Sequence, residues 1–345
     1  MDISIIIPVY NVEEYIERCI LSVCKQSMNN ISVECVLVND SSSDKSMDKA
    51  KSLIESYSGE ILFKIVTHDH NQGLSSARNT GMENATGKYL FFLDSDDYLE
   101  DMCIQELWNV VVNNPEVQMV MGNYQYVCSG VRGIDETRIP HGIISNYQLL
   151  ECFFIGAIPV VVWNCMVLRE IVVDYNLSFK PGLLNEDVLW SFHLLCHIDT
   201  FYFLRIITLN YETNPKSITY YLSNNRLCYL KYRIVIIDDL MNSFCKNHLV
   251  ANTLFVLSNM LTALDIIWGK ENLVEESEAL KIYEYRNNLF RMTLKSKRFI
   301  LLLFELLMYK PVGSVMKIRL FRNKFDTISL FVYRIAKSFD FLHLE

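Results

Sequence analysis

The first part of the chain alternates between short, continuous apolar runs and longer segments in which apolar residues recur every three or four positions. The apolar runs have the length of buried strands and cover residues 4–11, 33–40, 61–67 and 89–93. The periodic segments have one apolar face, as amphipathic helices do, and cover residues 12–24, 46–57 and 74–85. This alternation predicts a parallel sheet with helices on both faces.

Polar residues gather where the predicted strands end, and the densest cluster is Asp94–Asp97, with three carboxylates in four positions. In open α/β sheets, ligands bind beyond the carboxyl ends of the strands. Neighbouring acids raise one another's pKa, which favours a bound divalent cation, and oxygen ligands suit Mg²⁺ or Mn²⁺. The alternative is a solvated loop in which Asp96 or Asp97 caps a helix that starts at Tyr98.

Four segments agree in order and spacing with the motifs of a known family: residues 7–11 (IPVYN), 38–44 (VNDSSSD), 71–81 (NQGLSSARNTG) and 94–97 (DSDD). On these motifs the chain resembles family 2 glycosyltransferases of the GT-A fold, of the kind that assembles bacterial surface polysaccharides. The resemblance implies an α/β fold with a GT-A (Rossmann-like), mostly parallel sheet flanked by helices and a C-terminal helical extension.

The resemblance also implies a division into domains. A catalytic domain would cover residues 1–220, with a nucleotide-sugar half over about 1–125 and an acceptor half over about 126–220. Residues 221–345 would form a helical, basic extension.

The nucleotide-sugar half is expected to bind a UDP-sugar donor. The residues implied in this role are Pro8, Tyr10, Asn11, Asp40, Arg78, Asp94 and Ser95. Tyr10 would offer a flat apolar face to the uracil, and Asp40 would accept the hydrogen on its N3. Arg78, on a helix that Gly73 starts, would face the diphosphate or ribose. The alternatives are that Asp40 shapes a turn and that Arg78 is a surface residue.

The carboxylate cluster would then hold the metal. By resemblance, Asp96 is the main ligand of Mn²⁺ or Mg²⁺, and Asp94 contacts the ribose or, through water, the metal. Asp97 would either support the site or cap the next helix. The cation would bridge the two phosphates and stabilise the charge that develops on the departing UDP.

A second pair of acids, Glu186 and Asp187, precedes the amphipathic run 188–195 and therefore lies at a predicted helix start. The resemblance implies that Asp187 is the general base for the acceptor hydroxyl, while Glu186 and Trp163 lie on the acceptor side. A single displacement inverts the anomeric centre, so an α-linked donor would give a β-linked product. Without the resemblance, two acids that complement a helix dipole would be the simpler explanation.

One position departs from the family pattern. Glu212 stands where many relatives carry an Arg near the diphosphate, and Lys216 is a candidate to replace that charge.

The composition indicates an intracellular enzyme. The chain has 345 residues, 51% of them hydrophobic, and it leads from Met1–Asp2 straight into the first strand without a signal-peptide pattern. Its ten cysteines form no Cys-x-x-Cys pair, and Cys19, Cys24 and Cys35 fall at apolar core positions, so we expect reduced thiols.

Charge is unevenly distributed along the chain. Residues 281–345 contain 13 Lys or Arg against 5 Asp or Glu, although the whole chain has a net charge of −8. The apolar run 299–309 is too short to span a bilayer, which needs about 20 residues, but this basic region could lie on an anionic membrane surface. The alternative is a helical subdomain with a solvated basic face. The acidic remainder argues against a nucleic-acid partner.

These observations lead to one functional hypothesis. The chain would transfer a hexose or N-acetylhexosamine, such as galactose, glucose or N-acetylglucosamine, from UDP to a lipid-linked saccharide acceptor in capsule, O-antigen or exopolysaccharide assembly. Its place would be the cytoplasm, at the inner face of the bacterial membrane. A non-catalytic nucleotide-sugar-binding or scaffold protein is the alternative. A nucleotidyltransferase would need a glycine-rich phosphate loop, and Pro8–Asn11 stands in that place instead.

Overall fold

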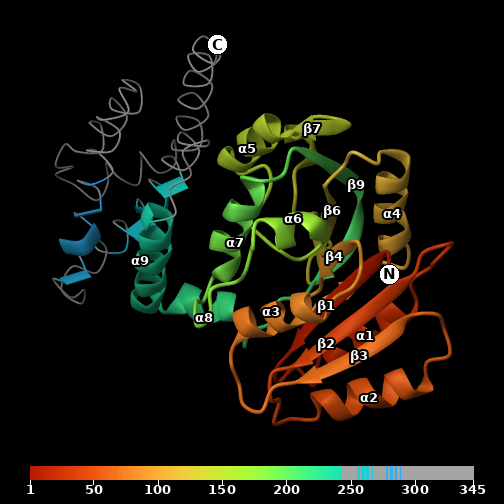
Figure 1. Cartoon of the computed structure of the whole chain (residues 1–345). Helices are drawn as coiled ribbons and strands as arrows, with labels where there is room; N and C mark the ends of the chain where they lie inside the picture. Colours follow the sequence, from red (N-terminus) through yellow and green to blue (C-terminus); the bar gives the residue numbers. More distant parts are fainter. Residues whose placement is uncertain are drawn as a thin grey trace. The chain divides into compact units, whose positions relative to one another are not determined.

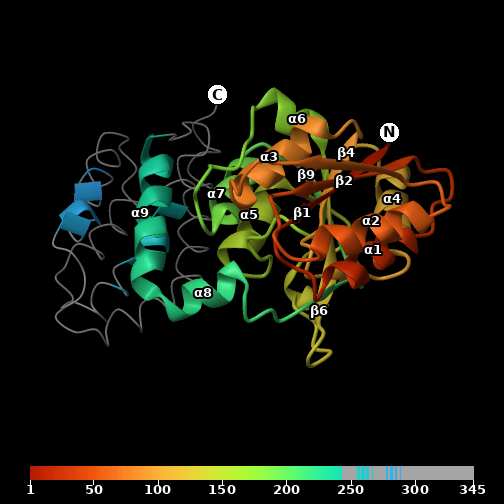
Figure 2. The same ribbon diagram turned by 90° about the horizontal axis from the view of Figure 1, so that it is seen from below.

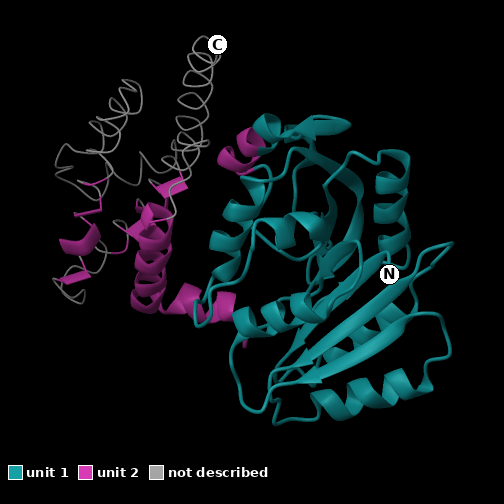
Figure 3. Cartoon of the chain, in the orientation of Figure 1, with its two compact units in different colours: residues 1–149, 157–215 teal, residues 150–156, 216–345 magenta. Residues whose placement is uncertain are grey.

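The computed structural model describes residues 1–242 and, further along, residues 255–256, 258–260, 262–263, 266, 277–278, 280–282, 284–285 and 288. Figure 3 shows that the chain divides into two compact units. The first comprises Met1–Leu149 and Ala157–Pro215, and the second Leu150–Gly156 and Lys216–Glu345. Every candidate site residue named above, apart from Lys216, belongs to the first unit.

The first four strands form a parallel sheet in the order β3-β2-β1-β4. They are β1 (Ile3–Val9), β2 (Val33–Asn39), β3 (Leu62–Thr67) and β4 (Tyr89–Phe92). Ile5 of β1 lies opposite Cys35 of β2 on one side and Phe91 of β4 on the other. All three side chains are fully buried, which explains why these strands read as unbroken apolar runs.

Helices cover both faces of this sheet, as the periodicity predicted (Figures 1 and 2). They are α1 (Ile16–Cys24), α2 (Ser46–Ser56) and α3 (Leu74–Asn84). The chain moves outward from β1 to β3 through α1 and α2 and then returns to β4 through α3, so right-handed crossovers place α3 on the opposite face. Gly81 allows α3 to approach the sheet, because a Cβ there would lie 2.3 Å from Ile6 Cγ2.

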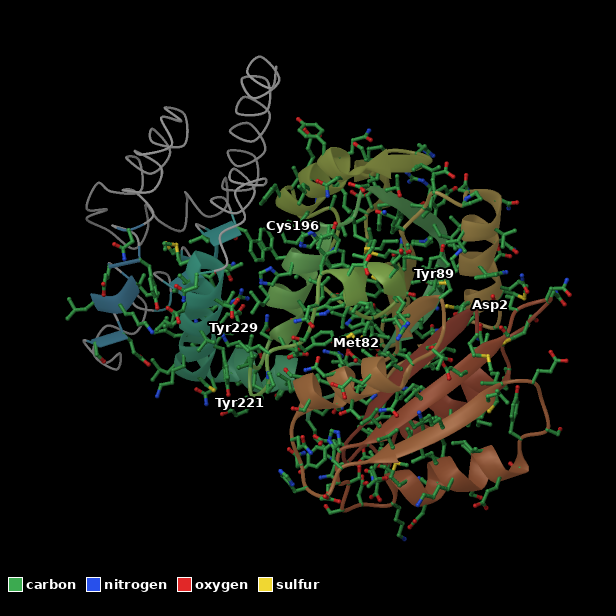
Figure 4. All side chains as sticks on the ribbon, viewed as in Figure 1. Asp2, Met82, Tyr89, Cys196, Tyr221 and Tyr229 are labelled. Carbon is green, nitrogen blue, oxygen red and sulfur yellow. The ribbon has the colours of Figure 1, made fainter. Side chains whose placement is uncertain are left out.

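This reversal makes the gap between β1 and β4 a topological switch point, where the loops after the two strands diverge. Tyr89, labelled in Figure 4, begins β4 and packs edge-on against Trp108 of α4 (Cys103–Asn113), with ring centroids 6.1 Å apart. The strand is thereby fixed at its start, and its carboxyl end carries the Asp94–Asp97 cluster.

Beyond β4 the sheet becomes mixed. In the described residues it has nine strands, in the order β3-β2-β1-β4-β8-β6-β9-β5, with β7 paired to β9. The later strands are β5 (Tyr98–Leu99), β6 (Met119–Tyr126), β7 (Ile143–Ser145), β8 (Cys165–Leu168) and β9 (Thr200–Tyr211). The helices of this half are η1 (Glu136–Arg138), α5 (Asn146–Phe154), α6 (Arg169–Asp174) and α7 (Glu186–Leu195).

The alternative that a helix starts at Tyr98 is wrong. Tyr98 and Leu99 pair antiparallel with Asn210 and Leu209 of β9, and α4 begins only at Cys103. The partner strand lies more than a hundred residues away, so local sequence does not reveal it. Asp96 and Asp97 therefore cap no helix at this point, and the solvated-loop alternative loses its basis.

In the second unit, α8 (Ile218–Asn224) begins after Ser217, whose side chain accepts a hydrogen bond from the Tyr220 amide. It is followed by α9 (Arg226–Asn242), whose buried residues include Leu230 and Ile237. No helix in the described residues is long and apolar enough to cross a membrane. The run 299–309 and most of the basic region 281–345 lie outside the described residues.

The cysteine expectation holds for two of three positions. Cys19 and Cys35 are buried, whereas Cys24 is only half-buried. Burial raises the pKa of the Cys19 and Cys35 thiols, which keeps them protonated and unreactive.

Candidate functional site

The loops after β1 and β2 are joined by polar side chains. Asn11 Oδ1 accepts a hydrogen bond from the Ser43 amide at 2.9 Å, and the Asn11 amide donates to Ser42 Oγ at 3.3 Å. Asn11 has a φ of 51° and Ser41 a φ of 61°, both in the left-handed region. Asn11 tolerates this conformation because its short polar side chain bonds locally. These contacts give Asn11 a structural role, and its contact with the nucleotide sugar stays a prediction.

Tyr10 and Pro8 differ in how accessible they are to a ligand. Tyr10 is 48% exposed at the carboxyl end of β1, so its ring is available for stacking. Pro8 is buried inside β1, opposite Val38.

Asp40 is almost completely buried and anchors the loop that leads into α3. Its carboxylate accepts hydrogen bonds from the backbone amides of Gln72 and Gly73, both at 2.8 Å. Asp40 Oδ1 also lies 2.7 Å from His68 Nδ1, and the other ring nitrogen of His68 contacts Thr80 Oγ1 at 2.9 Å. These contacts are those of an Asp that shapes a turn. The predicted hydrogen bond to uracil would have to form in addition to them.

We therefore expect Asp40→Ala to lower the free energy of unfolding by about 2 to 4 kcal/mol, because it leaves buried donors without their acceptor. Asp69→Ala, at an exposed neighbouring position, should change it by about 0.5 kcal/mol or less. Urea unfolding followed by tryptophan fluorescence measures both variants. An Asp40→Ala protein as stable as the Asp69→Ala control would contradict this structural role.

Arg78 is buried and bridges two carboxylates from distant parts of the chain. Its Nη2 donates to Asp94 Oδ1 at 2.7 Å, and its Nη1 donates to Glu186 Oε1. Only 2% of Arg78 is exposed, so the surface-residue alternative is wrong. Burial alone would lower the pKa of Arg78, but the charges of Asp94 and Glu186 raise it, so the guanidinium stays protonated. The Arg78 guanidinium thus pairs with Asp94 of the carboxylate cluster after β4 and with Glu186 of α7.

The helix that carries Arg78 also holds the segment in front of α7. Asn79 donates to the Phe179 carbonyl and accepts from the Phe179 amide, both at 2.8 Å. Phe179 in turn stacks on Trp190 of α7, with centroids 4.7 Å apart, and lies 5.4 Å from the Arg78 guanidinium carbon. The motif containing Arg78 and Asn79 therefore positions the start of α7.

Glu186 and Asp187 lie in the first turn of α7, as the sequence indicated. Asn185 precedes them with a φ of 66°, a left-handed conformation that Asn adopts more readily than most residues. Burial and the neighbouring charge of Glu186 raise the pKa of Asp187 to about 7, while Arg78 acts in the opposite direction. A carboxylate with a pKa near neutrality is suited to accept and release protons at physiological pH.

The turn Asp94–Asp97 contains acids in different surroundings. Asp96 Oδ2 accepts a hydrogen bond from Asn214 Nδ2 at 2.9 Å, and burial together with the charge of Asp94 raises the Asp96 pKa. Asp97 lies underneath, 1% exposed, and accepts from the Glu212 amide at 2.8 Å. Its Oδ2 is buried without a hydrogen-bond partner, and burial raises its pKa well above the usual value. Ser95, which lies between Asp94 and Asp96 in the sequence, is buried as well.

The turn fits a cation that is shared with a substrate. Among the described residues no three His, Cys, Asp or Glu side chains form a group that could hold a metal alone. Mg²⁺ and Mn²⁺ are often held by only one or two carboxylates, with phosphate oxygens and waters completing the shell. Asp96 and Asp94 can supply these carboxylates, and a cation would relieve the repulsion that raises the Asp96 pKa.

Trp163 lies next to the end of β4, where it forms an isolated bridge with Phe92. Its ring packs against Tyr124 and Tyr211, with centroids 4.8 and 5.5 Å away. The indole is 9% exposed, so most of its surface is already used in this packing.

Several residues around the site were not anticipated as part of it. His68 supports Asp40, Phe179 packs against Arg78, and Asn214 contacts Asp96. Each contact joins segments that are far apart in the chain or depends on a loop conformation, so no periodic signal identifies it.

Comparisons with known proteins agree with this geometry. Residues 4–175, about half of the chain, match the sequence model of the family described as Glycosyl transferase family 2. The uncharacterized glycosyltransferase EpsJ of Bacillus subtilis is 45% identical over 230 residues, which cover 63% of this chain and 62% of EpsJ. The poly(ribitol-phosphate) beta-N-acetylglucosaminyltransferase TarP of Staphylococcus aureus is 27% identical over 220 residues, covering 61% of this chain and 64% of TarP. The chain thus spans less than two thirds of these relatives.

Solved structures share the fold. Residues 1–349 of S. aureus TarS in complex with UDP-GlcNAc superpose with a TM-score of 0.65 and 16% identity, covering 98% of this chain and 91% of that one. The mannosyltransferase PcManGT of Pyrobaculum calidifontis, in complex with GDP-Man and Mn²⁺, gives a TM-score of 0.54 and 15% identity, with coverages of 98% and 87%. At this identity the likeness concerns the fold, and it confirms the expected GT-A class. The family match and the shared fold together show that the chain belongs to glycosyl transferase family 2.

Proposed function

We propose that the protein is an inverting, metal-dependent glycosyltransferase that moves a hexose or N-acetylhexosamine from a UDP-sugar to a hydroxyl of a lipid-linked glycan, forming a β-linkage. The observation that carries this proposal is the buried Arg78, which contacts Asp94 of the carboxylate turn and Glu186 beside Asp187. A protein that only binds a nucleotide sugar has no need to join a cation-binding turn to a carboxylate with a near-neutral pKa.

The donor would lie across the carboxyl ends of β1, β2 and β4. Tyr10 would stack on the base, and its 48% exposure leaves a ring face available. Asp96, with Asp94, would hold Mn²⁺ or Mg²⁺ against the diphosphate, where such a cation supplies charge stabilisation for the departing UDP. Arg78 would orient Asp94 through its 2.7 Å hydrogen bond.

Asp187 would act on the acceptor. Its raised pKa, about 7, allows it to take the proton of the attacking hydroxyl and release it again at neutral pH. Glu186 is occupied by Arg78 and would position Asp187, and Trp163 would form part of the acceptor side. Attack from the face opposite UDP would invert the anomeric centre.

N-acetylglucosamine is the first donor sugar to test. TarP is named as a beta-N-acetylglucosaminyltransferase, and TarS was crystallised with UDP-GlcNAc. We further propose that the acceptor is a lipid-linked saccharide of capsule, O-antigen or exopolysaccharide assembly at the cytoplasmic membrane face. The 13 Lys or Arg among residues 281–345 support contact with an anionic surface.

The direct test is nucleotide release by the purified protein from a panel of UDP-, GDP- and TDP-sugars, with Mn²⁺ or Mg²⁺ and with a chelator. We expect release from one UDP-sugar, stopped by the chelator and lowered at least tenfold by Asp96→Ala, because that change removes the main cation ligand. Asp174→Ala, at an exposed end of α6, is the matched control and should behave as wild type.

Metal-independent release would contradict the role of the cation. Asp96→Ala activity equal to the Asp174→Ala control would show that Asp96 is not a ligand. Tight UDP binding without any turnover, even with lipid-linked acceptors, would favour the non-catalytic alternative.

A further inference from the structure

Glu212 has a partner that accounts for its departure from the family pattern. It follows β9 and forms an ion pair with Arg18 of α1, with Arg18 Nη2 and Glu212 Oε2 2.7 Å apart. The side chains are 38% and 19% exposed, so the pair is partly shielded from solvent. The carboxylate is therefore directed toward α1.

Arg18 also contacts the carboxylate turn itself. The same Nη2 lies 3.3 Å from the backbone carbonyl oxygen of Asp96, to which it donates. The guanidinium carbon lies 4.3 Å from the ring centroid of Tyr98, directly after the turn. Arg18 of α1 thus contacts both the turn and the residue that directly follows it.

The segment around Glu212 approaches the turn from the other direction. The Glu212 amide donates to Asp97 Oδ1 at 2.8 Å, and Asn214 Nδ2 donates to Asp96 Oδ2 at 2.9 Å. Residues 212–214 are therefore hydrogen-bonded to two of the three acids of the turn. Arg18 connects the turn to residues 212–214, because its guanidinium contacts both the side chain of Glu212 and the backbone carbonyl of Asp96.

We propose that Arg18 and Glu212 form a positioning pair that fixes the Asp94–Asp97 turn in the conformation that binds the cation, and that Glu212 does not contact the diphosphate. This inference rests on the proposed metal-dependent function. Three acids in the turn repel one another, and an unpaired fourth carboxylate at position 212 would add to that repulsion. The positive charge of Arg18 offsets this repulsion by pairing with Glu212.

Arg18 borders open space, which makes position 18 suitable for substitution. Arg18 lines a cavity of about 710 Å³ between α1 and the strands β5, β6 and β9. Other residues that line it include Lys25, Glu100, Gln125 and Asn210. A change of side chain at position 18 therefore meets a cavity, so a glutamate can be accommodated there.

The test uses Arg18→Ala, Glu212→Gln and the exchanged double variant Arg18→Glu/Glu212→Arg in the full chain. The first readout is the affinity for Mn²⁺ in the presence of UDP, measured by electron paramagnetic resonance. We expect each single variant to bind Mn²⁺ about tenfold more weakly, as is common when a residue that supports a ligand is lost, and the exchanged variant to recover most of the affinity. The second readout is amide hydrogen exchange in residues 94–99 and 211–214, which should rise in the single variants.

Glu17→Gln is the matched control, because Glu17 lies on the same helix and pairs with Lys49 at 2.9 Å, with side chains 55% and 35% exposed. It should change neither readout. Single variants with wild-type Mn²⁺ affinity and exchange would overturn the proposal, as would a loss that the exchanged variant does not repair. If the wild-type protein binds no Mn²⁺ with UDP, the proposed metal dependence fails, while unchanged exchange in Arg18→Ala separately rejects the positioning pair.

Discussion

Asp187→Asn should lower kcat by about 10²- to 10⁴-fold, the range that a general base contributes, while UDP affinity stays within about twofold of wild type. The amide has nearly the same shape, and its oxygen can still accept the 2.9 Å hydrogen bond from the Val188 amide. It cannot take a proton from an acceptor hydroxyl. Transfer kinetics and UDP titration of the same preparation separate these effects.

The pH dependence of the wild-type enzyme provides an internal check of this assignment. Burial and Glu186 raise the pKa of Asp187 to about 7, and a base works only when it is deprotonated. We therefore expect kcat/KM to fall roughly tenfold per unit as the pH decreases below about 7, and to level off above it. The residual activity of Asp187→Asn should lack this acidic limb.

Asp174→Asn is the matched control, since Asp174 is an exposed carboxylate at the end of α6. A rate for Asp187→Asn equal to that of the control would exclude Asp187 as the base. An acidic limb that persists in Asp187→Asn would assign the titration to another group.

The sequence was sufficient to predict the nucleotide half of the fold, because its signals are local. A fully buried parallel strand must be apolar on both faces, so β1, β2 and β4 stand out as continuous runs. The carboxylate cluster follows directly from its place after β4. The strand β5 was missed because two residues carry too little periodicity, and its pairing with β9 depends on tertiary structure.

Contacts between side chains were predictable only where a motif implied them. The sequence assigned Asp40 to a base contact, whereas the fold gives it two backbone amides and His68 as partners. Glu212 was noticed as a departure, but its partner Arg18 lies almost two hundred residues away. Such a pair has no spacing rule, because it forms only when the fold brings α1 next to the segment that follows β9.

The arrangement around Arg78 suggests how one site can serve both substrates. The guanidinium contacts Asp94 on the donor side and Glu186 beside the candidate base. Asn79, the next residue, holds Phe179 in front of α7. The proposed donor and acceptor parts of the site are therefore fixed relative to each other by one short stretch of α3, so damage to that stretch should affect both.

Arg78→Ala should accordingly have the largest effect on stability, lowering the free energy of unfolding by about 3 to 5 kcal/mol. The change leaves Glu186, 4% exposed, and Asp94 without their shared cation. Arg78→Lys should recover only part of this loss, because one ammonium cannot reproduce two hydrogen bonds in the fixed geometry of a guanidinium. Urea unfolding followed by tryptophan fluorescence gives the comparison.

Arg132→Ala is the matched control for Arg78→Ala, because Arg132 forms an ion pair with Glu136 at 3.0 Å but is 50% exposed. Removing that pair should cost about 1 kcal/mol or less. If Arg78→Ala fails to fold, Arg78→Met/Glu186→Gln remains informative, since it removes both fully buried charges, leaves only the more exposed Asp94 without its partner and should restore part of the stability. An Arg78→Ala protein no less stable than Arg132→Ala would show that water compensates the two acids, and the bridge would then not hold the site together.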